Sequence, residues 1–455
     1  MKRPPGLRLC PSITLVPGGF AVILAGLTRL THPVSADPER PAESREGLFC
    51  WQAPTLVMQK AVLRKCYEFT RAREVRALGL YPYGTMLGRD ETCYGAHYLL
   101  NGRRVLMFGS NDYLGLTHDP RVMEAARDAV MRYGSGCSGS RMLNGTLTIH
   151  RELETELAAF LGREDVALFS TGYQANHGTL TALAQRGDVI LMDRDNHASL
   201  VDGCLSSLAR MVRYRHNCMD DLEATLESVA GEPNKMIVAD AVFSMQGDTV
   251  DLPNMVRLAE RYGTAIYLDE AHSIGVFGDC GRGIGEHFGL EEHVDVTMGT
   301  FSKSLAAVGG FVAAAAEVID YVRHHCRSYI FSASLPPGCV AAVRAALRII
   351  RQEPERRKVL LDLGNQVRRG LEAMGFSVLE GEAPIIPVIV GDEMAVMRAF
   401  HELLGEGVYV NPVLPPAASR ALLRISCMST HTPGDVERLL EAMAKVGKKL
   451  ALLVS

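Results

Sequence analysis

The sequence lacks the charge pattern of a nucleic-acid-binding protein. Its 455 residues carry a net charge of −4 at neutral pH, and no long run of lysine and arginine occurs. Proteins that bind nucleic acid usually cluster positive charge against the phosphate backbone. No helix-turn-helix module is evident ahead of the main domain, so we expect no DNA or RNA partner.

Paired cysteines with the spacing of metal ligands are also missing. The 11 cysteines are scattered, and in a chain of this length they are typical of reduced thiols in the core or at the surface. We therefore expect neither a disulfide nor a structural metal. The glycines of residues 281–285 do not predict a Rossmann site, because no strand runs directly into them and no correctly spaced helix start follows.

A long, uninterrupted apolar segment is missing as well. The apolar run of residues 13–27 follows three basic residues, as in a secretory signal, but it is short for a membrane span and is broken by Pro17-Gly18-Gly19. Three interpretations of residues 1–55 stay open: an export signal, a membrane-associated leader, or translated sequence upstream of a start such as Met58. We favour the last of these or a loosely ordered leader.

The residues that are present predict an α/β protein with a large and a smaller domain, for which the chain is long enough. A helical pattern over 55–78 predicts an amino-terminal helix, within a segment of residues 56–104. Apolar strands separated by glycine-rich loops over 105–335 predict a large domain with a mostly parallel sheet. Residues 336–455 predict a small α+β domain.

A candidate catalytic lysine follows a predicted buried strand. Lys303 lies in Gly299-Thr300-Phe301-Ser302-Lys303-Ser304, directly after the strand-like residues 294–298. An amine among small hydroxylated residues suits pyridoxal phosphate (PLP), because the amine forms a Schiff base while neighbouring hydroxyls bind the phosphate. Taken alone, such a cluster is more often a solvated turn.

A second candidate strengthens the PLP interpretation. The apolar residues 264–268 end at Asp269, which places this carboxylate at the carboxyl end of a parallel strand, where ligands of open α/β sheets bind. A carboxylate there can keep the pyridine nitrogen of PLP protonated. The chain between Asp269 and Lys303 is long enough for both groups to converge on one cofactor.

Three further strand ends carry candidate residues. The strand over 166–169 runs into Ser170-Thr171-Gly172-Tyr173 and then a helix, and such a helix amino terminus is a ready site for an anion. The strand over 189–192 is followed by His197, which without other information is more often a structural residue. The predicted strand over 235–243 is followed by Ser244.

These motifs together resemble the α-oxoamine synthases, which are fold-type I PLP enzymes that condense an amino acid with an acyl thioester and release carbon dioxide. The resemblance extends over residues 109–432. It rests on Asp269-Glu270-Ala271-His272-Ser273, on residues 299–304, and on residues 329–337. Within the family, Thr-Phe-Ser-Lys-Ser is similar to the form found in bacterial serine palmitoyltransferases.

The resemblance implies roles for individual residues. Lys303 would hold PLP, Asp269 would pair with the ring nitrogen, His272 would hydrogen-bond the ring oxygen, and His197 would stack on the ring and help to orient the substrate carboxylate. The implied cofactor-binding residues also include Gly172, Tyr173, Ser244, Thr300, Ser302, Ser332 and Ala333, the last two supplied across a homodimer interface. The implied substrate-binding residues are Asn111, Tyr113 and Arg424.

The implied function is a decarboxylating condensation of L-serine with a long-chain acyl thioester, carried by coenzyme A or a carrier protein, which gives a 3-keto sphingoid base. One departure is notable, because Leu414-Pro415-Pro416-Ala417-Ala418 lacks the arginine and the threonine that palmitoyltransferases carry in this loop. Relatives that use alanine or glycine, such as 8-amino-7-oxononanoate synthase or 2-amino-3-oxobutyrate ligase, therefore stay open as alternatives. A silent partner subunit is a third alternative, although Lys303 argues against it.

The implied substrates also suggest where the protein acts. An enzyme that consumes a cytosolic thioester gains nothing from export, so we expect a cytoplasmic homodimer with shared active sites. Peripheral association with a membrane stays open.

Overall fold

The structure is a computed structural model that describes residues 60–90, 93 and 95–453. The chain divides after residue 69 into two units, and the interpretations of residues 1–55 lie outside the described part.

The amino-terminal helix predicted over 55–78 is wrong as a single element. Its first residues, 55–59, lie outside the described part, and the rest forms a 3-10 turn over Ala61–Leu63 followed by α1 (Arg64–Glu68) and α2 (Arg71–Ala77). The helix is interrupted because Phe69 takes an extended backbone conformation, with φ −73° and ψ 98°, which ends the i to i−4 hydrogen-bond ladder.

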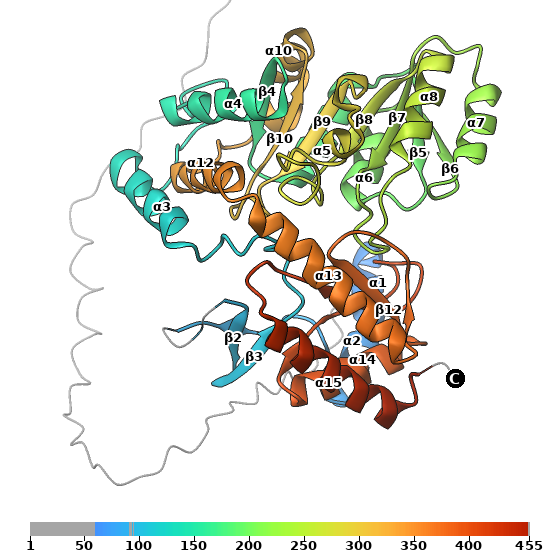
Figure 1. Ribbon diagram of the computed structural model, residues 1–455. Coiled ribbons are helices and arrows are strands. Elements are labelled where there is room, and N and C mark those ends of the chain that lie inside the picture. Colours follow the sequence, from blue (N-terminus) through green and yellow to red (C-terminus); the bar gives the residue numbers. More distant parts are fainter. Residues whose placement is uncertain (1–59, 91–92, 94, 454–455) are drawn as a thin grey trace, which may run out of the picture. The chain divides into compact units, whose positions relative to one another are not determined.

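The largest element is a seven-stranded sheet in the order β4-β10-β9-β8-β7-β5-β6 (Figure 1). All neighbouring strands are parallel except those that pair with β10, which runs antiparallel to β9 and β4. The strands are β4 (Asp165–Phe169), β5 (Val189–Asp193), β6 (Arg210–Tyr214), β7 (Lys235–Asp240), β8 (Ala265–Asp269), β9 (Val296–Thr300) and β10 (Gly310–Ala314). The predicted, mostly parallel sheet is confirmed.

Both faces of this sheet are buried. Along β5, Val189 and Leu191 belong to one hydrophobic core and Ile190 and Met192 to another, because successive side chains of a strand point to opposite faces. Helices supply the other halves of these cores: α3 (Pro120–Tyr133), α4 (Thr148–Leu161), α5 (Gly172–Leu183), α6 (Ala198–Ser206), α7 (Met219–Ser228), α8 (Leu252–Tyr262), α9 (Ile284–Phe288), α10 (Ala316–His325), α11 (Arg327–Ile330) and α12 (Pro337–Gln352).

Two four-stranded sheets accompany the large one. The sheet β11-β12-β15-β14 is antiparallel throughout and packs against two helices, α13 and α14, which in turn contact α15. Its elements are β11 (Ser377–Val378), β12 (Ile385–Ile389), β14 (Asn411–Val413), β15 (Leu422–Ser426), α13 (Glu355–Ala373), α14 (Glu393–Gly405) and α15 (Pro433–Leu450). The other sheet, β1-β2-β3-β13, joins the early strands β1 (Leu87–Gly88), β2 (His97–Leu100) and β3 (Arg103–Met107) to β13 (Val408–Tyr409).

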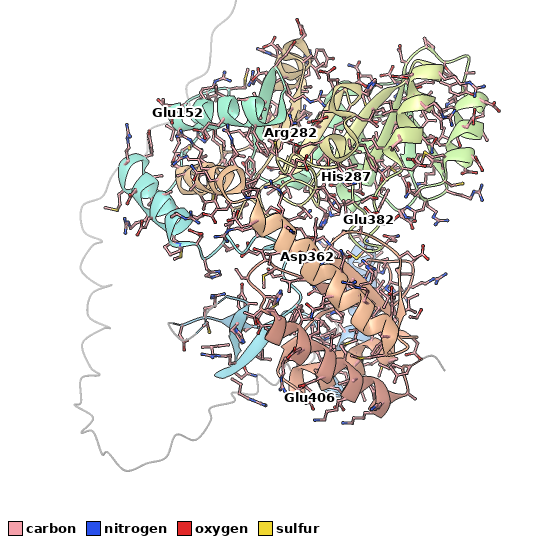
Figure 2. The ribbon with its side chains drawn as sticks, in the orientation of Figure 1. Glu152, Arg282, His287, Asp362, Glu382 and Glu406 are labelled. Atoms are coloured by element: carbon pink, nitrogen blue, oxygen red, sulfur yellow. The ribbon has the colours of Figure 1, made fainter. Side chains whose placement is uncertain are left out.

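Ion pairs and a helix cap secure the packing of the helices. Glu152 on α4, labelled in Figure 2, pairs with Arg344 on α12, and Glu406 accepts from Lys445 on α15 at 2.5 Å. At the start of α15, the Thr432 hydroxyl accepts from the Asp435 backbone N–H at 3.2 Å, which confirms the predicted cap. No helix among the described residues has the length and apolar character needed to cross a bilayer.

Candidate active site

The candidate active site is a cavity of about 300 Å³ at the carboxyl ends of β9, β8, β7 and β5. Strands that run in parallel deliver their last residues to the same edge of a sheet, which is why residues distant in sequence meet there. The cavity is lined by Thr171, Gly172, Tyr173, Asn176, His197, Ser199, Asp240, Asp269, Ala271, His272, Met298, Thr300, Ser302, Lys303, Val308 and Gly309.

The cavity contains most of the residues that the sequence predicts for cofactor binding. Eight of them line it: Gly172, Tyr173, His197, Asp269, His272, Thr300, Ser302 and Lys303. Ser244, Ser332 and Ala333 are not among the lining residues of this one chain. Ser332 accepts from the Gln174 side chain at 3.3 Å, and the Ala333 carbonyl accepts from the Ser170 hydroxyl at 2.5 Å.

Lys303 is the amine of the cavity, and its proton affinity is unusual for a lysine. Desolvation lowers the pKa of Lys303 to about 8, although the nearby carboxylates of Asp269 and Asp240 act in the opposite direction. At neutral pH an appreciable fraction of this amine is therefore uncharged. An uncharged amine can act as a nucleophile or accept a proton, whereas an ordinary lysine with a pKa near about 10.4 rarely does.

Asp269 is buried and held by two donors. Its Oδ1 accepts from the backbone N–H of Ala271 at 2.9 Å, and its Oδ2 accepts from the Asn176 side chain at 2.6 Å. With both oxygens held, the carboxylate keeps one orientation at the cavity wall. It can therefore pair with a protonated ring nitrogen.

The first turn of α5 and the loop after β9 form a small polar cradle. Thr300 and Ser302 have their hydroxyl oxygens 3.0 Å apart, next to the helix amino terminus that begins at Gly172. A Cβ at position 172 would lie 2.7 Å from Thr300 Oγ1, so only glycine leaves this cradle open. Unpaired backbone N–H groups of a first helical turn and two hydroxyls together suit a phosphate.

The predicted substrate residues form a cluster linked to the cavity. Arg424, buried on β15, donates through Nη1 to Asn111 Oδ1 at 3.0 Å and through Nη2 toward the Tyr113 hydroxyl at 3.5 Å. Tyr113 in turn lies 2.7 Å from Nδ1 of His272, which lines the cavity. Arg424 Nε also donates to the backbone carbonyl of Ser244 at 2.6 Å, so Ser244 takes part through its main chain.

Sequence reasoning missed four polar residues that line the cavity: Thr171, Asn176, Ser199 and Asp240. Asp240 is buried and accepts from the His197 backbone N–H at 2.6 Å. It could have been found, because it ends β7 by the same rule that identified Asp269. Asn176 and Ser199 lie within motifs that were recognised, but only packing shows that their side chains contact the site.

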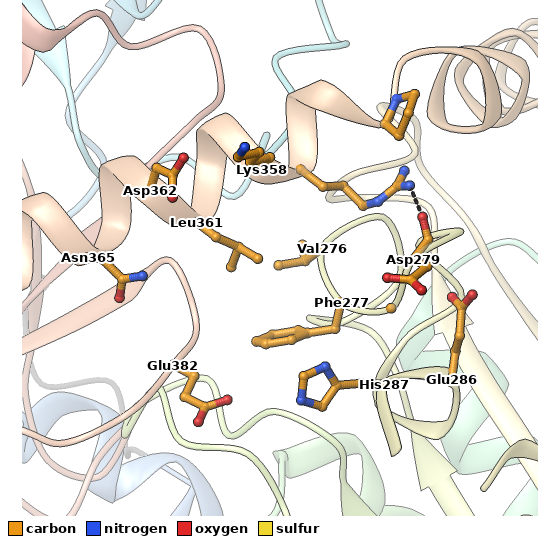
Figure 3. Close-up of a pocket in the computed structure, with 13 residues that line it drawn as sticks. Val276, Phe277, Asp279, Glu286, His287, Lys358, Leu361, Asp362, Asn365 and Glu382 are labelled. Carbon is orange, nitrogen blue, oxygen red and sulfur yellow. Dashed lines mark hydrogen bonds between the residues drawn. The ribbon is translucent and has the colours of Figure 1, made fainter. Parts of the chain in front are cut away.

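A larger cavity of about 700 Å³ lies between α13 and the segment 276–287, a loop that leads into α9 (Figure 3). None of the sequence-predicted site residues lines it. Its charged groups hold the loop instead, since Arg357 donates to the Asp279 carbonyl and Glu286 accepts from the backbone N–H groups of Cys280 and Arg282. The larger cavity therefore offers no candidate catalytic group from the sequence analysis, whereas the smaller one contains Lys303.

The described residues contain no group of three or more His, Cys, Asp or Glu side chains arranged to hold a metal ion. Their nine cysteines are free thiols.

A helix amino terminus, a lysine after one strand and a carboxylate at the end of another thus meet at one edge of the large sheet. The family model described as aminotransferase class I and II matches residues 103–443, and the chain belongs to this family. A serine palmitoyltransferase of Sphingobacterium spiritivorum is 45% identical over 384 residues, which cover 84% of this chain and 96% of that protein.

Two further comparisons involve a synthase and a solved structure. An 8-amino-7-oxononanoate synthase of Geobacter sulfurreducens is 42% identical over 387 residues, 84% of this chain and 98% of that protein. A solved serine palmitoyltransferase structure containing PLP superimposes with a TM-score of 0.82 at 36% identity, over 87% of this chain and 100% of that chain. These likenesses confirm the fold class and the family that the sequence motifs predicted.

Proposed function

We propose that the protein is a PLP-dependent acyltransferase that condenses L-serine with a long-chain acyl thioester, releases carbon dioxide, and forms a 3-keto sphingoid base. The observation that carries the proposal is the convergence of Lys303, Asp269 and the polar cradle at Gly172 on one cavity. Similarity to serine palmitoyltransferases over most of both chains supports the choice of reaction.

The residues of the cavity fit PLP. The first turn of α5 with Thr300 and Ser302 would hold the phosphate, Asp269 the ring nitrogen, and Lys303 the aldehyde carbon. When bound, PLP supplies an electron sink that stabilises negative charge on the substrate carbon. A volume of about 300 Å³ is at the lower end of the range for small-molecule sites, which suits a compact cofactor.

The chain's own residues then bind the substrate and move its proton. Arg424, whose guanidinium is oriented by Asn111, Tyr113 and the Ser244 carbonyl, would exchange some of these hydrogen bonds for bonds to the serine carboxylate. The Lys303 amine, whose pKa is lowered to about 8, accepts the proton from the substrate carbon through Nζ. His272, whose pKa is lowered well below its usual value by burial, stays neutral and bonds Tyr113.

A homodimer is the second part of the proposal. Apolar side chains are exposed in the segments near the cavity: Met142, Leu143, Val308 and Phe331. If these side chains form one contiguous apolar patch, that patch would mark a protein interface. Ser332 and Ala333 would then complete the partner's site rather than their own. Light scattering on the purified protein should give twice the monomer mass, and Leu143→Glu with Phe331→Glu should lower it.

The reaction is tested by a substrate competition. The PLP-loaded protein is incubated with equal amounts of L-serine, L-alanine and glycine and with acyl thioesters of several lengths, and the amino-ketone product is identified by mass. A product from serine and a long chain supports the proposal. A product from alanine or glycine would instead favour the synthase alternative. Two observations support that alternative: the 42% identical synthase and the changed 414–418 loop.

The lysine assignment has its own test. Borohydride reduction of the PLP-loaded protein should attach the cofactor to the peptide that contains Lys303, and Lys303→Ala should lose both the attachment and the product. Product formation by Lys303→Ala would refute the assignment. Absence of product from the intact, PLP-loaded protein would favour a silent partner subunit.

A further inference from the structure

Asn176 lies at the centre of a chain of hydrogen bonds that joins two residues of the proposed cofactor site. It is 1% exposed and projects from α5. Its Nδ2 donates to Asp269 Oδ2 at 2.6 Å and to Ser199 Oγ at 2.9 Å. Its Oδ1 accepts from the hydroxyl of Tyr267 at 2.9 Å.

Chemistry sets the direction of each of these bonds. A carboxylate can only accept, so the amide nitrogen of Asn176 must face Asp269 and the amide oxygen must face Tyr267. The Tyr267 hydroxyl is fully buried, and burial raises its pKa well above the usual value, so it keeps its proton and donates it. Asn176 uses both of its amide hydrogens, and the hydroxyl hydrogen of Ser199 is left free to donate elsewhere.

The Ser199 hydroxyl can donate its hydrogen to His197. The ring Nδ1 of His197 lies 2.7 Å from Ser199 Oγ and 3.3 Å from the Ser199 backbone nitrogen. Both of these groups are donors, so Nδ1 accepts, and a neutral imidazole then carries its proton on Nε2. Desolvation and the positive charge of Lys303 lower the pKa of His197, against the effect of Asp269, and so favour the neutral ring.

We propose that Asn176 is a positioning residue: through Ser199 it holds His197 in the Nε2–H tautomer, and with the same amide group it orients Asp269. The consequence follows from the proposed function, on which this inference rests. An Nε2–H group is a donor for the substrate carboxylate, whereas the other tautomer would present a lone pair to it. The Asn176 amide would thus orient both Asp269, which is proposed to bind the cofactor, and His197, which is proposed to bind the substrate carboxylate.

The protonated ring nitrogen can be measured directly. We would label the full-length, PLP-loaded protein with ¹⁵N-histidine and identify the protonated nitrogen of His197 by long-range ¹H–¹⁵N correlation, using His197→Gln for assignment. The expected result is Nε2–H. Ser199→Ala keeps only the longer backbone N–H contact to Nδ1 at 3.3 Å, so it should lower the Nε2–H share in favour of Nδ1–H and raise the KM for L-serine about tenfold, the size of one lost hydrogen bond to a charged group. Ser199→Thr, which keeps the hydroxyl, should behave as wild type.

Asn176→Ala tests whether the same amide group also orients Asp269. It should shift the His197 tautomer in the same direction and also weaken PLP binding about tenfold, because Asp269 loses a donor. If this variant does not fold, Ser199→Ala decides the question alone.

The chain offers a matched control. His177 Nε2 lies 3.2 Å from Ser206 Oγ, so this contact joins α5 and α6, as the Asn176–Ser199 bond does, but neither of its residues lines the cavity. Ser206→Ala should leave the His197 tautomer, PLP binding and KM unchanged. An Nδ1–H ring in the wild type, or a Ser199→Ala protein whose share of Nε2–H equals that of wild type, would overturn the inference. The ring measurement needs no turnover, so it stays decisive even if the protein does not condense serine.

Discussion

Replacing Gly172 by alanine should separate cofactor binding from folding. Gly172 opens α5 without a positive φ, so alanine meets no backbone strain there. Its Cβ would lie 2.7 Å from Thr300 Oγ1, 3.0 Å from Thr300 Cβ and 3.1 Å from Met298 Cε. The fold can relieve this crowding by rotating the Thr300 side chain, but the hydroxyl then leaves the cradle proposed for the phosphate.

The expected loss of PLP affinity follows from the hydrogen bond that would be lost. Loss of one hydrogen bond to a charged phosphate costs about 1.5–3 kcal/mol, so PLP should bind about 10- to 100-fold more weakly. The assay is PLP titration of the cofactor-free protein, followed by absorbance, together with thermal unfolding. Unchanged PLP affinity in a folded Gly172→Ala protein would refute the placement of the phosphate.

Gly405→Ala is the matched control for this prediction. Gly405 ends α14, and a Cβ there would have no atom within 4 Å. Because glycine costs about 0.5–1 kcal/mol relative to alanine in a helix, this variant should be slightly more stable and should bind PLP as wild type does. Weaker PLP binding by Gly405→Ala would mean that the assay reports a general effect of glycine replacement.

Three further predictions concern charge. In the cofactor-free protein, the rate at which Lys303 reacts with an added aldehyde should increase with pH, and the midpoint of this increase should lie at about pH 8. A midpoint near the ordinary lysine pKa of about 10.4 would contradict the conclusion that desolvation lowers the pKa of Lys303. Although desolvation opposes it, Asp193 and Asp248 raise the pKa of His216 from 6.5 to about 10. The protonated His216 therefore stabilises the fold fully below pH 6.5, and this contribution is lost as the pH rises toward about 10. In urea unfolding, His216→Gln should have a lower free energy of unfolding than wild type at pH 6.5, and this difference should disappear over that range. Arg424→Lys should raise the KM for L-serine at least about tenfold, because an ammonium cannot replace a fork of donors; a smaller rise would mean that the carboxylate binds elsewhere.

The strand ends were predictable because the signal for them is local. An apolar run that stops at a polar residue predicts both a buried strand and the sheet edge at which that residue lies. Asp269 and Lys303 follow this rule, and β8 and β9 do pair in parallel. The cap of the last helix was predictable for the same reason, since Thr432 and Asp435 are three residues apart.

The amino-terminal helix was mispredicted because periodicity alone does not show a break. The apolar and charged residues around Phe69 continue the helical pattern on both sides, yet the backbone becomes extended there. The antiparallel strand β10 was also not predicted. It lies between β9 and β4, and β4 is more than a hundred residues earlier in the chain.

The class of sheet, the strand end at Asp269, the lysine that follows β9 and the family resemblance were all predictable from the sequence, because each depends on residues close together in the chain. The side chains that complete the candidate site became evident only from the packing of the folded chain. The contacts of Asn176 with Asp269 and of Arg424 with Asn111 join residues 93 and 313 positions apart. Such contacts arise where separate helices and strands pack together, and no local pattern of polar and apolar residues encodes them.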